Sequence, residues 1–537
     1  MKNKTIMEYI LSVEQMRKAD QFAIDTLGIP GLILMENAGL KTAQHIAQKF
    51  HPIAGKSIGI FCGKGNNGGD GFVIGRQLNR MGANAHFWLV GKKAEVSGDA
   101  KINLDIAVKL GLPIIELLSW DPNLNLQSYD ILIDALLGTG LKGDVRGIYL
   151  DIIEKINSHK GDVVAVDAPT GLDCDTGKIL GKCVEANLTV TMGNVKTGML
   201  LYPGKTFVGE LAIADLNVPD FAFEKLGAQA FLPQRGDYRI MLPDRPKNAY
   251  KNQFGKILVL AGSTGLTGAA MLCSKAALRS GAGMVMLGCP KSLNVIFEAA
   301  LQEVMTVPLP ETETGSISAN AYDALHEALQ WSRVLALGPG LSSHSETIVF
   351  VHRVLKEQSL PIVIDADGLN SIAEDISLFK DYEGDIIITP HVGELSHLCK
   401  ISSEEILKAP VEIVREFAKK WQVVLLLKGA PTIIGDSNRN IFFNITGNSG
   451  MATAGAGDVL TGIIAGLLGQ GLTAIDAAVL GAYLHGLAGD RASWQTGQRG
   501  VIAGDIMENV SQALADLENQ EVDLVSKYSQ PKIERIY

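Results

Sequence analysis

A small-residue loop followed by an aspartate is the segment with the clearest chemical meaning. Ala454–Gly457 leads directly into a predicted helix that begins near Asp458. Glycine and alanine let backbone N–H groups converge, and the helix N-terminus adds partial positive charge, so the loop can hold a phosphoryl group. Asp458 would then take a proton from an attacking hydroxyl. The simpler alternative is a tight turn in which Asp458 only caps the helix.

Glycine and polar residues also follow other apolar strands of the second half. These segments are Ala261–Gly268, Gly338–Gly340, Thr389–Glu394 and Lys428–Thr432. Open α/β sheets bind ligands at the carboxyl ends of their strands, where these segments would meet. The alternative is that the glycines only punctuate short loops. Because several strand ends carry this pattern, we predict one phosphoryl-transfer site at this edge of the sheet.

In this order, the motifs AGSTGLTGAA, GPGLS, IDADGLN, TPHVGE, KGAPT and NSGMATAGAGDVLTG resemble the ribokinase-like superfamily, and within it the ADP-dependent NAD(P)H-hydrate dehydratases. The resemblance covers about residues 250–513. It implies that the hydrated dinucleotide contacts Ala269, Gly340, His391 and Asp458. It implies an adenine-nucleotide site made of Lys428, Gly429, Ala430, Pro431, Thr432 and Gly457.

That resemblance also implies a mechanism. Asp458 would deprotonate the hydroxyl of the hydrate, which would attack the terminal phosphoryl of ADP with magnesium present. Loss of the phosphate would regenerate NAD(P)H and leave AMP. The main alternative is a kinase for a small alcohol or vitamin precursor, which would use the same site with ATP and release a stable phosphate ester.

In the first half, Gly63–Gly68 matches the pattern G-x-G-x-x-G between a strand and a helix. A dinucleotide-binding fingerprint also needs an acidic residue at the end of the next strand, and that strand has none before Glu95. An ordinary dehydrogenase is therefore not predicted. Asn66–Gly71 instead places two amides and a carboxylate on a glycine-rich turn, which can cradle phosphate and offer oxygen to a hard cation.

Two more strand ends, Asp134–Gly143 and Asp167–Asp173, converge on the same edge. With NNGGDG they resemble, in order, the NAD(P)H-hydrate epimerase domain over about Ile10–Val218. The resemblance implies potassium ligands Asn67, Asp134 and Thr170. It implies substrate contacts from Asn66, Asn67, Gly68, Gly69, Asp70, Gly138, Thr139, Gly140, Leu141, Lys142, Gly143, Asp144, Tyr149 and Asp167.

Asp167 is the candidate acid or base for interconverting the two hydrate epimers, because it ends a strand inside the expected cavity. Its alternative role is to cap the turn Pro169–Gly171. Lys64 beside the phosphate loop could neutralise substrate charge or simply face water. The non-enzymatic alternative for this half is a binding module that holds a nucleotide for regulation.

The two expected activities complement each other. A dehydratase that works by in-line phosphoryl transfer needs one orientation of the hydroxyl, so it should accept one epimer. A partner activity that equilibrates the epimers would allow complete repair of NADH and NADPH hydrates.

Composition agrees with an α/β enzyme. The 537 residues are 47% hydrophobic and carry a net charge of -10, which excludes a broad basic surface for nucleic acid. The six scattered cysteines, with no C-x-x-C pair, predict free thiols in a reducing compartment and no structural zinc. The N-terminus predicts an amphipathic helix rather than a signal peptide, and no stretch predicts a membrane span. We expect a cytoplasmic homo-oligomer.

Alternating apolar strands and helical patterns predict parallel sheets covered by helices. The fold class is α/β with two domains, an N-terminal Rossmann-like α/β/α sandwich over 1–220 and a C-terminal ribokinase-like α/β/α domain over 228–520. The predicted strands are Ser57–Cys62, Ala85–Val90, Asp130–Asp134, Val163–Asp167, Leu188–Met192, Lys256–Leu260, Met284–Gly288, Val334–Gly338, Ile362–Asp365, Asp385–Thr389 and Val423–Lys428, with a hairpin over 432–445. The Pro-rich, charged stretch 217–254 should separate the domains, and the last twenty or so residues should form a frayed tail.

Overall fold

The computed structural model describes residues 7–120, 124–519 and 533–536. The chain forms two compact α/β units. The N-terminal unit comprises Tyr9–Gln229 and Pro531–Tyr537, and the C-terminal unit comprises Ala230–Gln530 and Met1–Glu8. Both units contain mainly parallel sheets covered by helices, which confirms the predicted α/β fold class with two domains.

The sheet of the N-terminal unit has eight strands in the order β20-β9-β7-β6-β5-β2-β3-β4, and all neighbours are parallel. Its strands are β2 (Ser57–Cys62), β3 (Asn84–Val90), β4 (Ile114–Leu117), β5 (Ile131–Ala135), β6 (Asp162–Val166), β7 (Leu188–Met192), β9 (Glu210–Ala214) and β20 (Ile533–Ile536). The central strands are apolar throughout because helices cover both faces. Their carboxyl ends lie at one edge, where the predicted motifs follow.

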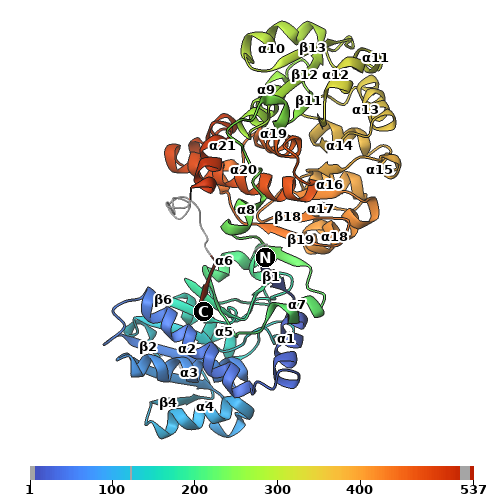
Figure 1. Ribbon diagram of the computed structural model, residues 1–537. Helices are drawn as coiled ribbons and strands as arrows, with labels where there is room; N and C mark the ends of the chain where they lie inside the picture. The colour runs from blue at the N-terminus through green and yellow to red at the C-terminus, as the bar shows by residue number, and fades with distance from the viewer. Residues whose placement is uncertain (1–6, 121–123, 520–532, 537) are drawn as a thin grey trace. The chain divides into compact units, whose positions relative to one another are not determined.

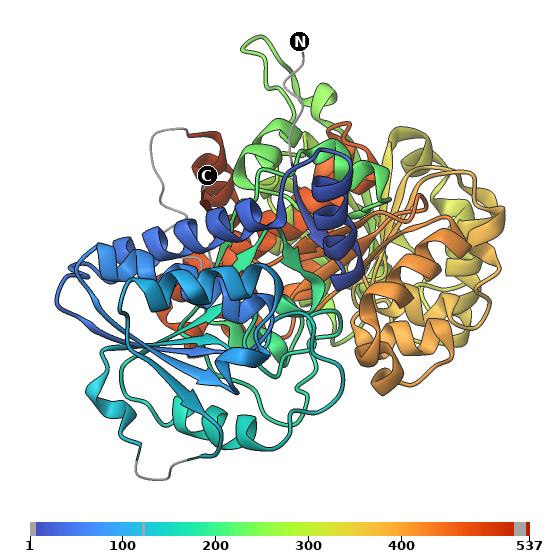
Figure 2. The ribbon, with the colours of Figure 1, turned by 90° about the horizontal axis from the view of Figure 1, so that it is seen from below.

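Helices cover the two faces of this sheet as separate apolar layers. On one face, α2 (Gly31–Lys49), α3 (Asn66–Arg80) and α4 (Gly98–Lys109) share a core with the strands. On the other, α5 (Ile148–Asn157) packs through Ile152, Ile153 and Ile156. Figure 2 shows the blue helices and the teal helix on opposite sides of these strands.

The sheet of the C-terminal unit runs β13-β12-β11-β14-β15-β16-β17-β18-β19-β10. Its strands are β10 (Ala230–Leu232), β11 (Lys256–Leu260), β12 (Met284–Pro290), β13 (Met305–Leu309), β14 (Val334–Leu337), β15 (Ile362–Ile364), β16 (Ile386–Ile388), β17 (Val424–Leu427), β18 (Thr432–Gly435) and β19 (Ile441–Asn444). β13 to β17 pair in parallel, and β18 pairs antiparallel with β17 and β19, as the predicted hairpin requires.

One apolar core joins this sheet to four helices: α9 (Thr267–Arg279), α19 (Ala456–Gly469), α20 (Ala474–Thr496) and α21 (Ala503–Glu518). Small residues let α19 approach closely, since a Cβ at Gly462 would lie 2.1 Å from the Cys273 carbonyl oxygen of α9. The other side carries α13 (Ser345–Glu357), α14 (Ala366–Ile372), α16 (Val392–Cys399) and α18 (Pro410–Trp421) (Figure 1). α14, α16 and α19 begin at the edge where the parallel strands end.

Short elements complete the two units. They are α6 (Gly204–Val208), α7 (Asp220–Lys225), α8 (Arg235–Met241), α10 (Asn294–Ala300), α11 (Ala321–Ala324), α12 (His326–Trp331), α15 (Leu378–Asp381) and α17 (Ser403–Lys408). The stretch 217–254 was predicted to lack pattern, yet it contains α7, β10 and α8. These are three to seven residues long, too short to produce a visible periodicity.

Two predictions at the termini need correction. The predicted N-terminal helix begins only at α1 (Val13–Asp25), because β1 (Glu8–Leu11) precedes it and pairs with β8 (Val195–Lys196). Ser12 starts α1 with a capping box to Gln15. The predicted frayed tail is wrong over 533–536, which form β20 beside β9, and the rest of it, 520–532 and 537, lies outside the described residues.

All six cysteines are free, and five of them are buried, as predicted. Within the part of the chain that the structure describes, no helix has the length and apolar character needed to cross a membrane.

Candidate functional site

The loop before α19 has the geometry of an anion-binding turn. Gly455 takes a left-handed conformation with φ 90° and occupies the N-cap, so α19 begins at Ala456. A Cβ at Gly455 would lie 2.7 Å from Leu272 Cδ1 and 3.0 Å from Ala503 Cβ, which requires glycine there. Asp458 therefore lies in the first helical turn and is not the N-cap residue. The capping alternative does not describe it.

A buried ion pair lies beneath this turn. Lys428, at the end of β17, places its Nζ 2.7 Å from Asp365 Oδ1 and 3.6 Å from Glu394 Oε2. The other oxygen of Asp365 accepts a 2.7 Å hydrogen bond from the Thr461 hydroxyl of α19. A Cβ on Gly457 would lie 3.3 Å from Lys428 Nζ. The ion pair thus contacts the helix turn that carries Asp458.

The surroundings of Asp458 favour its protonated form. Burial first, and then the nearby carboxylate of Asp365, raise its pKa to about 7, although Lys428 opposes them. Lys428 is oriented toward Asp365 and Glu394, and these carboxylates outweigh burial and raise the pKa of its ammonium. A carboxyl with a pKa near neutrality matches the requirement for a general base at physiological pH.

The residues predicted to contact the hydrate lie near the starts of helices α9, α16 and α19 and in the loop after β14. A Cβ on Gly340, whose φ is 63°, would lie 3.2 Å from Ala269 Cβ of α9, and the Gly340 carbonyl accepts a 2.8 Å bond from Ser263 Oγ. His391 caps α16: its Nδ1 accepts from the backbone N–H groups of Gly393 and Glu394 at 2.9 and 3.1 Å. Its side chain remains 59% exposed.

The predicted nucleotide segment is a turn between β17 and β18. It starts at Lys428, whose backbone N–H donates to the Pro390 carbonyl at 2.9 Å, beside His391. Gly429 and Ala430 are exposed, and Pro431 follows a cis peptide bond. The Thr432 hydroxyl donates to the Gly429 carbonyl at 3.2 Å. The turn therefore offers accessible backbone next to the ion pair.

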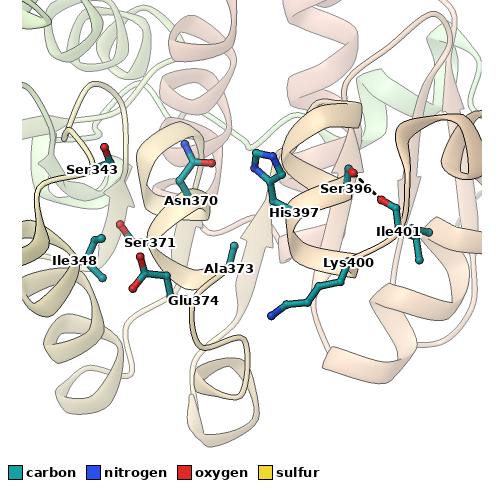
Figure 3. A pocket seen from close by; sticks show the side chains of 10 residues that line it. All are labelled: Ser343, Ile348, Asn370, Ser371, Ala373, Glu374, Ser396, His397, Lys400 and Ile401. Atoms are coloured by element: carbon teal, nitrogen blue, oxygen red, sulfur yellow. Dashed lines mark hydrogen bonds between the residues drawn. The ribbon is translucent and has the colours of Figure 1, made fainter.

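A cavity of about 620 Å³ in this unit lies elsewhere. It is lined by Ser343, Ile348, Asn370, Ser371, Ala373, Glu374, Ser396, His397, Lys400 and Ile401. These residues include the C-terminal ends of α14 and α16, whereas Asp365 and His391 cap the opposite ends of the same helices (Figure 3). None of the residues predicted for the dehydratase site lines it.

In the N-terminal unit, the predicted phosphate loop opens α3. The backbone is tight here: a Cβ at Gly68 would lie 1.9 Å from the Gly63 carbonyl oxygen. The amide oxygen and nitrogen of Asn67 are both buried and have no hydrogen-bond partner among the described residues. A buried amide without partners is costly, and a bound cation or substrate would satisfy it.

A cavity of about 700 Å³ collects most of the predicted epimerase residues. Its lining includes the predicted Asn66, Asn67, Asp70, Gly138, Thr139, Gly140, Leu141, Lys142, Tyr149 and Asp167. Four predicted residues do not line it: Gly68, Gly69, Gly143 and Asp144. Gly68 and Gly69 are buried inside α3. The lining also includes Arg17, Asp20 and Lys64, of which the sequence suggested only Lys64.

The predicted potassium ligands come from three segments: Asp134 from β5, Asn67 from the first turn of α3 and Thr170 from the loop after β6. Asp134 is fully buried, and its carboxylate accepts from Thr170 N at 2.8 Å and Thr170 Oγ1 at 2.7 Å. Burial raises its pKa to about 6, against the opposing effect of these hydrogen bonds. The oxygens of Asp134 and the unpartnered amide of Asn67 fit a monovalent cation. The Thr170 hydroxyl already donates to Asp134 and accepts from Leu137 N at 3.0 Å.

Asp167 follows β6 in a left-handed conformation, with φ 63°. Its Oδ1 accepts from Lys196 Nζ at 2.6 Å and from the Thr191 hydroxyl at 3.3 Å. Burial would raise the pKa of Asp167, but Lys196 outweighs burial and holds it below its ordinary value. Asp167 is therefore ionised at neutral pH. A non-glycine residue held at positive φ beside a cavity is often found at functional sites.

Three important neighbours were missed from the sequence as site residues. Lys196 is 1% exposed and lies in the two-residue strand β8. Asp20 lies on α1, and Asp365 belongs to the motif IDADGLN, for which no role of this residue was predicted. Only IDADGLN carried a signal, because an aspartate directly after a buried strand points to the carboxyl edge of the sheet.

Comparisons with known proteins agree with this arrangement. Residues 257–512 match the family model described as NAD(P)H-hydrate dehydratase, and residues 31–198 match the model described as YjeF-related protein N-terminus. A bifunctional NAD(P)H-hydrate repair enzyme from Moorella thermoacetica is 41% identical over 96% of this chain and 99% of its own length. One from Thermofilum pendens is 35% identical over 97% and 99%.

Among solved structures, the ADP/ATP-dependent NAD(P)H-hydrate dehydratase from Bacillus subtilis, co-crystallised with ATP and Mg²⁺, is 27% identical. The match has a TM-score of 0.46 and covers 53% of this chain and 98% of that one. The sequence comparisons span both units and nearly the full length of the relatives. The chain belongs to the family of bifunctional NAD(P)H-hydrate repair enzymes.

Proposed function

We propose that the chain repairs hydrated NADH and NADPH in two steps. The N-terminal unit interconverts the two epimers of the hydrate. The C-terminal unit dehydrates the S epimer with ADP, releasing NAD(P)H, AMP and phosphate. The observation that carries this proposal is that one chain, 41% identical to such a repair enzyme over 96% of its length, holds a partly buried carboxyl with a shifted pKa at a strand-end site in each unit.

In the C-terminal unit, Asp458 takes the proton of the hydrate hydroxyl as that oxygen attacks the terminal phosphoryl of ADP. The phosphoryl oxygens are received by the backbone N–H groups of the turn Gly455–Gly457 and by the first turn of α19. Lys428, Gly429, Ala430, Pro431, Thr432 and Gly457 hold the nucleotide, and Ala269, Gly340 and His391 contact the hydrate. The phosphate then leaves as the ring nitrogen lone pair forms a carbon–nitrogen double bond, and loss of a proton from the neighbouring ring carbon restores the carbon–carbon double bond of NAD(P)H.

Magnesium fits this site through the chemistry of the available donors. Asp367 and Glu394 are carboxylates near Asp458, and both contribute to raising its pKa. Oxygen ligands of this kind suit a small hard cation, and they would hold it. When bound, magnesium neutralises charge on the phosphate oxygens.

In the N-terminal unit, Asp167 is the acid or base that transfers a proton as the configuration of the hydroxyl-bearing carbon changes. The other predicted residues that line the cavity hold the dinucleotide. Asn67, Asp134 and Thr170 would hold potassium, with Thr170 contributing through its hydroxyl or its carbonyl oxygen. When bound, the ion would supply positive charge that keeps the buried Asp134 ionised and would satisfy the amide oxygen of Asn67.

The kinase alternative is less well supported. It would use only the Asp458 site, and it gives no role to the cavity around Asp167. The relatives that match across both units carry the repair activities in their names.

The test is recovery of NADH absorbance in the near ultraviolet from a mixture of both NADH hydrate epimers, with magnesium and potassium, comparing ADP, ATP and no nucleotide. We expect complete recovery that depends on nucleotide. Recovery of one epimer alone would remove the epimerase from the proposal. No recovery with any nucleotide, together with phosphorylation of a small alcohol, would favour the kinase.

A further inference from the structure

A second carboxyl in the N-terminal cavity has no place in the mechanism above. Asp20 lies on α1, next to Met16, Ala19 and Ala23, which bury the helix against the unit. It lines the same cavity as Asp167. Its Oδ1 is buried and has no hydrogen-bond partner among the residues described. An unpartnered buried carboxyl oxygen is costly unless a ligand occupies the cavity in the working enzyme.

Lys196, whose charge acts on Asp20, is already fully hydrogen-bonded. Lys196 Nζ donates to Asp167 Oδ1 at 2.6 Å, to Thr191 Oγ1 at 2.8 Å and to the Met192 carbonyl at 2.9 Å. An ammonium has three N–H groups, so Lys196 has no donor left for Asp20. Arg17, one turn earlier on α1, contacts the Thr139 carbonyl at the exposed mouth, 3.5 Å away.

The surrounding groups give Asp20 and Asp167 different pKa values. Burial first, and the charge of Asp167 as well, raise the pKa of Asp20 to about 6, although Lys196 opposes them. Asp70 of α3 faces the same group of charges, and burial together with Asp167 and Asp20 raises its pKa strongly. Two carboxyls whose environments separate their pKa values in one cavity form an acid and base pair.

We propose that Asp20 is the second catalytic group of the epimerase, the acid that works with Asp167 as base on the hydroxyl of the hydrated ring. The inference rests on the proposed function. It adds a residue that lines the cavity and has a buried carboxyl oxygen with no hydrogen-bond partner among the described residues.

The step balances as follows. Asp20 gives its proton to the hydroxyl oxygen on the ring carbon beside the nitrogen. The carbon–oxygen bond breaks, water leaves, and the nitrogen lone pair forms a carbon–nitrogen double bond. A water adds to the other face of that carbon, and Asp167 takes its proton as the new carbon–oxygen bond forms. One water leaves and one enters. The proton that Asp167 gains returns to Asp20 through the solvent before the next turnover, and the reverse direction uses the two carboxyls in exchanged roles.

The experiment measures epimer exchange in the full chain without nucleotide, by chromatography, from pH 5 to pH 8. The variants are Asp20→Asn, Asp20→Glu and Asp70→Asn, with Asp25→Asn as a control because Asp25 is an exposed carboxylate on the same helix. Dehydration of the S epimer is measured in each sample as an internal control. A parallel run in ¹⁸O-water records label entering the hydrate.

We expect Asp20→Asn to lower kcat for exchange by about 100-fold, the usual scale for losing one acid or base. The fall in wild-type rate above about pH 6 should disappear with it. Asp20→Glu should restore that fall and part of the rate, Asp25→Asn should match wild type, and each exchange should bring one solvent oxygen into the product.

The proposal is overturned if Asp20→Asn keeps the wild-type rate and pH profile, or if Asp70→Asn alone abolishes the fall at high pH. If Asp20→Asn does not fold, the proposal is overturned by an Asp20→Glu variant that keeps the full wild-type rate, or by a wild-type product that contains no solvent oxygen. A wild-type chain that exchanges no epimers contradicts the proposed function itself.

Discussion

Each unit places a lysine, a candidate catalytic aspartate and other carboxyl groups at the end of a parallel sheet. The lysine pairs with a different kind of carboxyl in each unit. In the N-terminal unit, Lys196 contacts the candidate base Asp167 directly, and the pKa of Asp167 lies below its ordinary value. In the C-terminal unit, Lys428 contacts Asp365 instead, and the pKa of Asp458 rises to about 7. Lys196 thus holds the pKa of Asp167 low, whereas burial and the carboxylate of Asp365 outweigh Lys428 and raise the pKa of Asp458.

This difference suits the two proposed reactions. A phosphoryl-transfer base must accept a proton from an alkyl hydroxyl and benefits from a pKa near the working pH. A carboxylate held ionised by a lysine is instead a constant acceptor, and it needs a separate group with a higher pKa as its acid. The N-terminal cavity provides two such groups in Asp20 and Asp70.

The largest expected effect is in the C-terminal unit. Asp458→Asn removes the proposed base without changing its size, so dehydration of the S epimer should fall by about 1,000-fold, within the range for a general base. Nucleotide binding and epimer exchange should remain. The measurement is NADH absorbance recovery with purified S epimer. Turnover within a few-fold of wild type would contradict the role of Asp458.

The matching change in the N-terminal unit is Asp167→Asn. Epimer exchange should fall by about 100-fold or more, since a positioned acid or base contributes on that scale. NADH recovery from a mixed hydrate should then stop once the S epimer is consumed, with the initial rate unchanged. Abolished exchange with substrate binding retained would disfavour the binding-module alternative, whereas exchange at the wild-type rate would contradict the role of Asp167.

A third change breaks the pairing itself. Lys196→Met leaves the carboxylate of Asp167 buried without its cation, and the free energy of unfolding of the N-terminal unit should fall by about 3 kcal/mol at pH 7. Because Lys196 holds the pKa of Asp167 low, its stabilisation is present above the ordinary pKa of aspartate and is lost as pH falls below it.

The measurement for Lys196→Met is urea unfolding of wild type and variant at several pH values. The stability difference should shrink as the pH falls below the ordinary pKa of aspartate, because Asp167 then takes a proton. A difference that does not depend on pH would show that Lys196 acts only through packing.

The smallest expected effect is at the rim. Lys64 pairs with Glu95 at 3.0 Å, and both side chains are nearly half exposed. Exposed ion pairs contribute little because solvent screens them, so Lys64→Ala should change the KM for epimer exchange by less than about fivefold. A larger rise in KM would mean that Lys64 binds substrate charge.

Much of this organisation could be predicted from the sequence. The central strands, such as β2 and β11, were predicted to the residue because buried parallel strands are continuous apolar runs between polar turns. Edge strands were missed: β13 is partly exposed and contains Pro308, so its sequence does not resemble a buried strand. Motif residues were predictable because chemistry fixes their types and spacing.

The electrostatic partners could not be predicted. Lys196 is 29 residues from Asp167, and Lys428 is 63 residues from Asp365. No local pattern links such pairs, because the folded sheet brings them together. Asp20 is still more distant, on a helix whose polar positions resemble an ordinary solvated face. Which carboxyl a lysine contacts depends on tertiary structure.

The central claim is tested most directly by measuring both activities against pH in one protein sample, with saturating magnesium. Dehydration of the S epimer should rise through pH 7 and be lowered about 100-fold at pH 5, as expected for a base with a pKa of about 7. Epimer exchange should persist at pH 5, because the pKa of Asp167 lies below its ordinary value. Dehydration that is constant from pH 5 to 8, or two activities that rise together through pH 7, would contradict the account.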